Sequence, residues 1–113
     1  MEISPELEEK VRELQETQQQ TRLVMTQRYQ VELELRETER ALDELKKGEN
    51  PETYKVVGRI LIRTASKDLI KELEEKVETL KLRLSALEKQ EKRLRERLIS
   101  LQDRLKGIVS VGG

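Results

Sequence analysis

The second half of the chain carries an apolar repeat that is typical of long paired helices. Apolar residues recur there at alternating steps of three and four, and one polar residue, Glu91, interrupts them. The members of this repeat are Ile70, Leu73, Val77, Leu80, Leu84, Leu87, Leu94, Leu98, Leu101, Leu105 and Ile108. Spacing of this kind, sustained over about five heptads, predicts a coiled-coil helix whose apolar seam packs against a second helix.

The first half of the chain can supply a partner helix of matched length. Ser4 can cap this helix, and Pro5 suits its first position. Gly48 follows a basic last turn, so we predict a helix over residues 4–47.

The second helix is expected to begin at its cap, Ser66, and to end at Gly107. It would cover residues 66–107 and leave residues 108–113 as a flexible tail. With 113 residues, the chain is expected to form one domain over residues 1–113.

The seam of the first helix is less regular than that of the second. It divides into two repeats, one through Leu7, Val11, Leu14, Gln18, Thr21 and Met25, and the other through Val24, Arg28, Val31, Leu35, Thr38, Leu42 and Leu45. The offset between them predicts a three-residue insertion that changes the local winding. Folding the chain back places Leu45 near Ile70 and the polar stretch of the first helix near Glu91, which favours an antiparallel pair. We interpret Glu91 as a polar break in the seam that is either solvated or sets register.

Residues 48–66 break the helical pattern and predict a β-hairpin. The segments on either side of Gly58 are rich in β-branched and apolar residues, and Gly58-Arg59 can form a two-residue turn. Strands are expected over residues 54–57 and from residue 60 to residue 63 or 64. The fold class is therefore mostly α: a long antiparallel coiled-coil hairpin with a short β-hairpin at the helix–helix connection.

The hairpin is predicted to be an assembly site. An isolated two-stranded hairpin is marginal in water, and the narrow seams of the helices cannot cover both of its faces. Exposed strand edges also favour pairing with other chains. We therefore expect it to join hairpins of other subunits in an oligomeric sheet or β-barrel. The expected interface residues are Tyr54, Val56, Val57, Ile60, Leu61 and Ile62.

Composition excludes several classes of function. Neither cysteine nor histidine is present, which rules out a disulfide, a zinc site of the usual ligands, and thiol or imidazole chemistry. The 23 basic and 23 acidic residues are interspersed, and aromatic residues make up 2% of the chain, which argues against nucleic-acid binding. No apolar run approaches the roughly 20 residues that span a bilayer. We expect no catalytic residue, cofactor or metal, and we expect a cytoplasmic protein; the abundance of Glu, Lys and Arg favours a thermophile.

The order of these parts resembles the beta-type subunit of prefoldin, a chaperone of archaea and eukaryotes. The resemblance covers essentially the whole chain and is most specific at "YKVVGRILIRT", residues 54–64, and "LEKQEKRL", residues 87–94. The single hairpin is similar to the beta type, because the alpha type carries a longer insertion with two. The resemblance implies a hexamer of two alpha and four beta subunits with a double-barrel body. It also implies that the tips of the helical arms hold non-native polypeptides without ATP and pass them to a group II chaperonin.

Apolar residues near the two chain ends are the candidate client-binding residues. In an antiparallel pair these ends lie together, and a frayed end exposes its seam. The candidates are Ile3, Leu7, Val11, Leu105, Ile108, Val109 and Val111. Leu7, Val11, Leu101 and Leu105 can equally be ordinary seam residues. The leading hypothesis is an ATP-independent holdase; the alternative is a purely structural oligomeric spacer or tether that binds folded partners.

Overall fold

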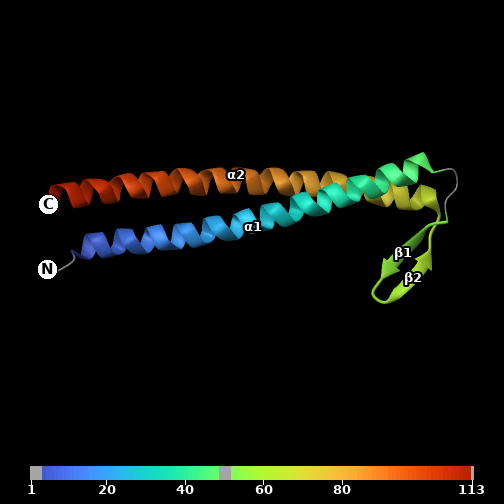
Figure 1. Ribbon diagram of the computed structural model, residues 1–113, viewed down its shortest axis with the longest axis horizontal. Coiled ribbons are helices and arrows are strands. Elements are labelled where there is room, and N and C mark those ends of the chain that lie inside the picture. Colours follow the sequence, from blue (N-terminus) through green and yellow to red (C-terminus); the bar gives the residue numbers. More distant parts are fainter. Residues whose placement is uncertain (1–3, 49–51, 113) are drawn as a thin grey trace. The chain divides into compact units, whose positions relative to one another are not determined.

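Two long helices joined by a short antiparallel hairpin make up the fold, as predicted (Figure 1). The computed structural model describes residues 4–48 and 52–112, with side chains up to Ser110. The elements are α1 (Pro5–Lys47), β1 (Tyr54–Val57), β2 (Ile60–Arg63) and α2 (Ser66–Gly112). Within this described part of the chain, neither helix is both long and apolar enough to cross a membrane.

The start of α1 has the predicted cap. The Ser4 side-chain oxygen accepts a hydrogen bond from the Leu7 backbone N–H at 3.1 Å, and its carbonyl accepts one from Glu8 at 3.1 Å. The start of α2 differs from the prediction by one residue. The Leu69 N–H donates to the Ala65 carbonyl at 3.0 Å, so Ala65 occupies the cap position and Ser66 lies inside the first turn.

The predicted end of α2 is wrong, because the helix continues past Gly107 to Gly112. A glycine ends a helix most effectively when it takes the left-handed conformation. Among the described glycines only Gly58 has a positive φ, so Gly107 does not form such a cap. Glycine inside a helix costs about 1 kcal/mol relative to alanine, which weakens a helix without stopping it. Residues 108–112, predicted as tail, therefore belong to the last turns of α2.

The chain divides into two compact units, each built from parts of both helices. The terminal unit contains residues 1–29 and 86–113, and the hairpin unit contains residues 30–85. This division does not decide whether the whole chain forms one domain, so that expectation stays a prediction.

The seam of α2 is confirmed. Every predicted seam residue from Ile70 to Ile108, with Glu91 among them, is buried or half-buried in the structure. Val77, Leu80 and Leu101 are at most 7% exposed. The heptad spacing alone was sufficient for this result, because leucine dominates the repeat.

The seam of α1 corrects the predicted insertion. Apart from Glu13, Met25 and Glu32, which are half-buried beside it, the buried and half-buried residues of α1 follow one unbroken alternation of three and four: Leu7, Lys10, Leu14, Thr17, Thr21, Val24, Arg28, Val31, Leu35, Thr38, Leu42 and Leu45. Val11 and Gln18, which were predicted in the seam, are exposed. Lys10 and Thr17 take the corresponding seam positions instead.

Local hydrogen bonds explain why polar residues can occupy this seam. The Thr17 side chain is 3% exposed, and its hydroxyl donates to the Glu13 carbonyl at 2.7 Å. Lys10 lays its aliphatic stem in the seam while its Nζ reaches a Glu13 carboxylate oxygen at 3.4 Å. Because Thr17 and Lys10 each have a partner on α1 itself, their polar groups can lie in the seam at little cost.

The hairpin has the predicted strands and turn. Gly58 adopts φ of 60°, and the strands pair Val57 with Ile60 and Val56 with Leu61. Beyond the strands, the Thr64 N–H donates to the Thr53 carbonyl at 2.9 Å, and the Thr53 hydroxyl donates to the Thr64 carbonyl. These bonds close the base of the hairpin where it meets the helices.

Candidate binding surfaces

The β-hairpin exposes apolar side chains on both faces. The register places Tyr54, Val56, Leu61 and Arg63 on one face, and Lys55, Val57, Ile60 and Ile62 on the other. Every strand residue is exposed, with Val56, Ile60 and Leu61 at 69%, 64% and 65%. The structure thus brings all six predicted interface residues together on one small element. Apolar exposure of this density is typical of a surface that another chain covers.

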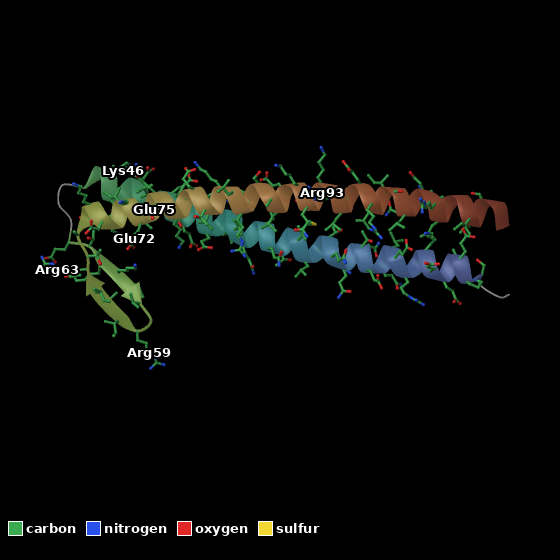
Figure 2. All side chains as sticks on the ribbon, turned by 180° about the vertical axis from the view of Figure 1, so that it is seen from behind. Lys46, Arg59, Arg63, Glu72, Glu75 and Arg93 are labelled. Carbon is green, nitrogen blue, oxygen red and sulfur yellow. The ribbon has the colours of Figure 1, made fainter. Side chains whose placement is uncertain are left out.

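Charged side chains border the hairpin. Lys55 reaches Glu72 of α2 with Nζ 3.0 Å from Oε2, and Arg63 approaches Glu52 at 3.4 Å. In Figure 2, Arg59 projects from the turn, while Arg63 and Glu72 lie beside the opposite end of the hairpin. These ion pairs are exposed and contribute little to stability. They leave the apolar faces uncovered.

The terminal unit opens its seam toward the start of α1 and the end of α2. Leu101 is 4% exposed, whereas Leu105, Ile108 and Leu7 are half-buried. Beside them runs a groove of about 320 Å³ lined by Leu7, Glu8, Val11, Arg12 and Gln15. The apolar seam is therefore partly accessible at this end of the unit, as it also is at half-buried Leu94 and Leu98.

Two of the predicted client-binding residues stand outside the seam and widen this surface. Val11 is 38% exposed and Val109 is 62% exposed. The Arg95 guanidinium contacts the Met25 sulfur at 3.5 Å, which shows that these two residues lie level with each other in this unit. Two heptads further along each helix, the same register places Val11 level with Val109. Of the remaining candidates, Ile3 lies outside the described residues, and Val111 lies in the last turns of α2.

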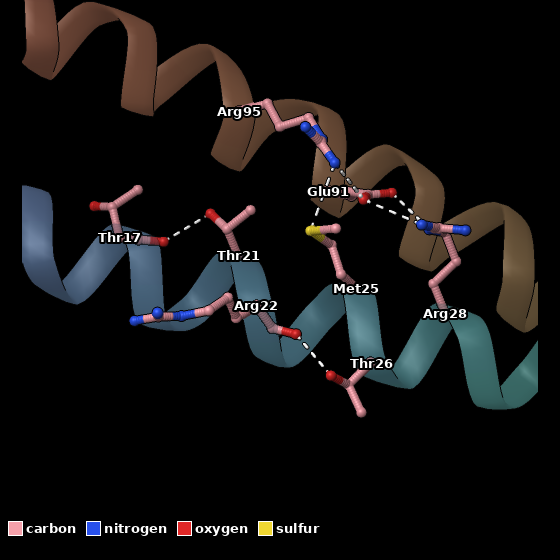
Figure 3. A network of polar contacts seen from close by, with 8 residues as sticks. All are labelled: Thr17, Thr21, Arg22, Met25, Thr26, Arg28, Glu91 and Arg95. Carbon is pink, nitrogen blue, oxygen red and sulfur yellow. Dashed lines mark hydrogen bonds and ion pairs between the residues drawn. The ribbon is translucent and has the colours of Figure 1, made fainter.

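A polar cluster interrupts the seam of the terminal unit (Figure 3). Glu91 is 9% exposed. Its carboxylate oxygen Oε2 lies 2.7 Å from Nε of Arg28, and Oε1 lies 3.2 Å from Nη2 of Arg95. Two arginines thus share one nearly buried carboxylate, and Arg28 is the seam residue of the pair. The interpretation of Glu91 as a polar break in the seam is consistent with this geometry.

Next to this cluster lies a second groove, which the sequence did not predict. It measures about 370 Å³ and is lined by Gln18, Thr21, Arg22, Met25, Arg95 and Leu98. The side chains of Met25 and Arg95 meet across it in Figure 3. Sequence analysis could have predicted this groove if it had assigned one continuous seam to α1, because Gln18 and Met25 then lie beside the seam.

None of the grouped acidic side chains in the described residues is arranged to hold a metal ion. The predicted absence of a cofactor stays a prediction.

The chain is similar to known proteins along nearly its whole length. A family described as "Prefoldin subunit" matches residues 8–110. The curated prefoldin subunit beta of Archaeoglobus fulgidus is 47% identical over 96% of this chain and 95% of its own length. That of Thermococcus onnurineus is 42% identical over 91% of this chain and 90% of its own. Among solved structures, the prefoldin beta subunit from Thermococcus strain KS-1 matches with a TM-score of 0.84 and 39% identity, covering 95% of each chain.

Proposed function

The chain belongs to the prefoldin family of chaperone subunits, and on that premise we propose that it is part of an ATP-independent holdase. In this proposal, the open end of the terminal unit captures non-native polypeptides, and the β-hairpin joins the subunit to others. The observation that carries the proposal is the accessible seam around Leu7 and Ile108, flanked by exposed Val11 and Val109.

The open end suits a client that is not yet folded. Non-native polypeptides expose scattered apolar side chains, so their holder needs apolar surface that its own fold does not consume. Each apolar side chain covered on binding contributes roughly 1.5 to 3 kcal/mol at most. A few such residues give weak, reversible contacts, and several subunits acting together would strengthen them by multivalency.

The hairpin suits permanent burial between subunits. Its two apolar faces and unpaired strand edges are surfaces that a larger sheet would satisfy. We propose that Tyr54, Val56, Val57, Ile60, Leu61 and Ile62 form the contact in a β-barrel body. The relatives are named as beta subunits, which supports a partner of alpha type. A hexamer of two alpha and four beta subunits, acting in the cytoplasm and delivering clients to a group II chaperonin, completes the proposal.

Client scope tests this function directly. The assembly formed with an archaeal alpha subunit is mixed with two unrelated denatured proteins as each is diluted from denaturant, and aggregation is followed by light scattering. A holdase suppresses the aggregation of both. Failure to suppress either one would favour the alternative, a structural tether that binds folded partners.

Removing residues 107–113 locates the capture surface. This truncation withdraws Ile108 and Val109 but leaves the hairpin unit intact. We expect the mass of the assembly to stay the same and the protection of clients to weaken. Unchanged protection would place capture elsewhere in the assembly.

A further inference from the structure

The two grooves of the terminal unit open along the same side of the helix pair. On α1, the residues Val11, Gln15, Gln18, Arg22 and Met25 follow one another at steps of four and three, so they form one stripe beside the seam. The first two residues of this stripe line the groove near Leu7 together with Glu8 and Arg12, and the last three line the groove near Leu98. On α2, the matching stripe is Arg95, Ile99, Gln102, Lys106 and Val109. We call these two stripes together the groove side.

The opposite side of the same unit has a different character. Its α1 stripe begins with four consecutive glutamates and ends with a glutamine and a leucine: Glu6, Glu9, Glu13, Glu16, Gln20 and Leu23. The α2 stripe opposite contains Arg97, Ser100 and Arg104. Acidic residues of one helix thus flank basic residues of the other, which favours the antiparallel pairing and leaves a hydrated, charged surface. We call this the charged side.

Exposed apolar residues follow the same division. Five large apolar side chains are exposed in the described part of the terminal unit, namely Val11, Leu23, Tyr29, Ile99 and Val109. Tyr29 continues the α1 stripe of the groove side beyond Met25, so only Leu23 lies on the charged side. At the levels where the charged side has four glutamates, the groove side has Glu8, Val11 and Gln15.

We propose that the groove side is a lateral binding surface for an extended and partly apolar segment of a non-native polypeptide. The surface would continue the open end of the seam inward as far as the groove at Met25 and Leu98. This inference rests on the proposed holdase function and names the residues that contact the client.

The dimensions and chemistry of the groove side fit such a segment. Val11 and Arg22 are eleven residues apart on α1, which corresponds to roughly 16 Å along the helix. An extended chain covers that distance with about five residues, so client side chains can enter both grooves at once. The amides of Gln15, Gln18 and Gln102 can donate to and accept from the peptide groups between them. The polarizable thioether of Met25 tolerates apolar side chains of varied shape.

Site-specific crosslinking tests the proposal, since the chain has no cysteine of its own. The two variants compared are Gln18→Cys on the groove side and Gln20→Cys on the charged side. These positions are two residues apart in the sequence, and both are exposed. Each variant, and Val109→Cys at the open end, is labelled with a photoreactive benzophenone maleimide before assembly with alpha subunits. The probe is reduced, carboxymethylated lactalbumin, which stays unfolded in buffer.

The expected result is crosslinking to the probe from position 18 at a yield several-fold above that from position 20. Equal yields from both positions would overturn the lateral surface, and crosslinking from position 109 would then leave the proposed function standing. Crosslinks from position 18 to another subunit in the absence of probe would show a subunit contact and would also overturn it. If none of the three positions crosslinks to the probe, both the lateral surface and capture at the open end are wrong.

A charge-insertion pair provides a second, independent readout. Gln18→Glu with Gln102→Glu places two carboxylates on the groove side. Gln90 lies one heptad before Arg97 and is exposed, so Gln20→Glu with Gln90→Glu places two carboxylates on the charged side. We expect the first pair to weaken capture of the unfolded probe several-fold and the second to leave it unchanged, with equal helix content by circular dichroism. Equal effects of the two pairs would contradict the proposal.

Discussion

The terminal unit and the hairpin unit each contain a pair of helices, but the residues that form the seam between the helices differ. In the hairpin unit, the α1 seam consists of Val31, Leu35, Thr38, Leu42 and Leu45, and only the threonine is polar. In the terminal unit, it consists of Leu7, Lys10, Leu14, Thr17, Thr21, Val24 and Arg28, and the polar residues are the majority. The α2 side is mainly leucine in both. One unit is therefore held together by apolar packing, and the other combines apolar packing with polar contacts.

The location of the exposed apolar side chains also differs between the units. The hairpin unit concentrates it in two strands with unpaired edges, a form that suits permanent burial between subunits. The terminal unit spreads it over an opened seam and one flank, a form that suits weak and varied contacts. We propose that assembly and capture are separated along the chain. The first prediction below tests the hairpin as the assembly surface, and the next two test the difference between the seams of the two units.

The largest effect is expected from a charge on the hairpin. Leu61→Asp and Ile62→Asp alter opposite faces, and a carboxylate buried without a partner costs several kcal/mol. Each variant should therefore lose the assembled mass in light scattering while keeping its helix content. Arg59→Asp at the exposed turn is the control and should assemble normally. A variant that keeps the parental mass would show that its face of the hairpin is not an interface.

A smaller effect is expected at the polar cluster of the terminal unit. Glu91→Leu removes the nearly buried carboxylate that Arg28 and Arg95 share, which should lower the free energy of unfolding by about 1 to 3 kcal/mol. The double variant Arg28→Leu with Glu91→Leu removes both charges and should be at least as stable as the parent, because well-packed apolar residues often replace an ion pair without loss. Thermal unfolding followed by circular dichroism measures both. A single variant more stable than the parent would mean that the pair does not stabilise the fold.

The smallest effect is expected when the terminal seam is made to resemble the hairpin unit. Lys10→Leu should raise the free energy of unfolding by about 1 kcal/mol, since it adds apolar surface at a half-buried position. Val11→Leu, one residue away and outside the seam, is the control and should change stability less. Denaturant unfolding of the two variants distinguishes them. An equal gain from both would contradict the continuous seam and favour the predicted insertion.

The sequence was sufficient for the parts of the fold that apolar residues define. The α2 seam and the strands around Gly58 follow directly from leucine spacing and from β-branched residues. The α1 seam was misassigned because its buried positions include Lys10 and Thr17, while apolar Val11 stands beside them on the exposed flank. A hydrophobic pattern cannot reveal that a threonine hydroxyl is satisfied by its own helix. The end of α2 was misplaced for a related reason, since a glycine indicates a helix end only when its φ is positive.

The candidate sites show the same limit. The exposure of the six hairpin residues could be predicted from sequence, because the narrow seams of the two helices cannot cover both faces of the hairpin. The groove near Met25 and Leu98 could not, because it depends on which α1 residues flank the seam, and the predicted insertion assigned Gln18 and Met25 to the seam itself.

The most direct measurement of the separation between assembly and capture uses two variants of the assembled protein. One carries Val11→Ser and Val109→Ser, which withdraw the exposed apolar pair of the terminal unit, and the other carries Leu23→Ser, which withdraws an exposed apolar residue from the charged side. Aggregation of a denatured client and the mass of the assembly are recorded for each. The account predicts full mass for both, weakened protection for the first and parental protection for the second. Parental protection by the first variant would contradict the assignment of capture to the open end of the terminal unit.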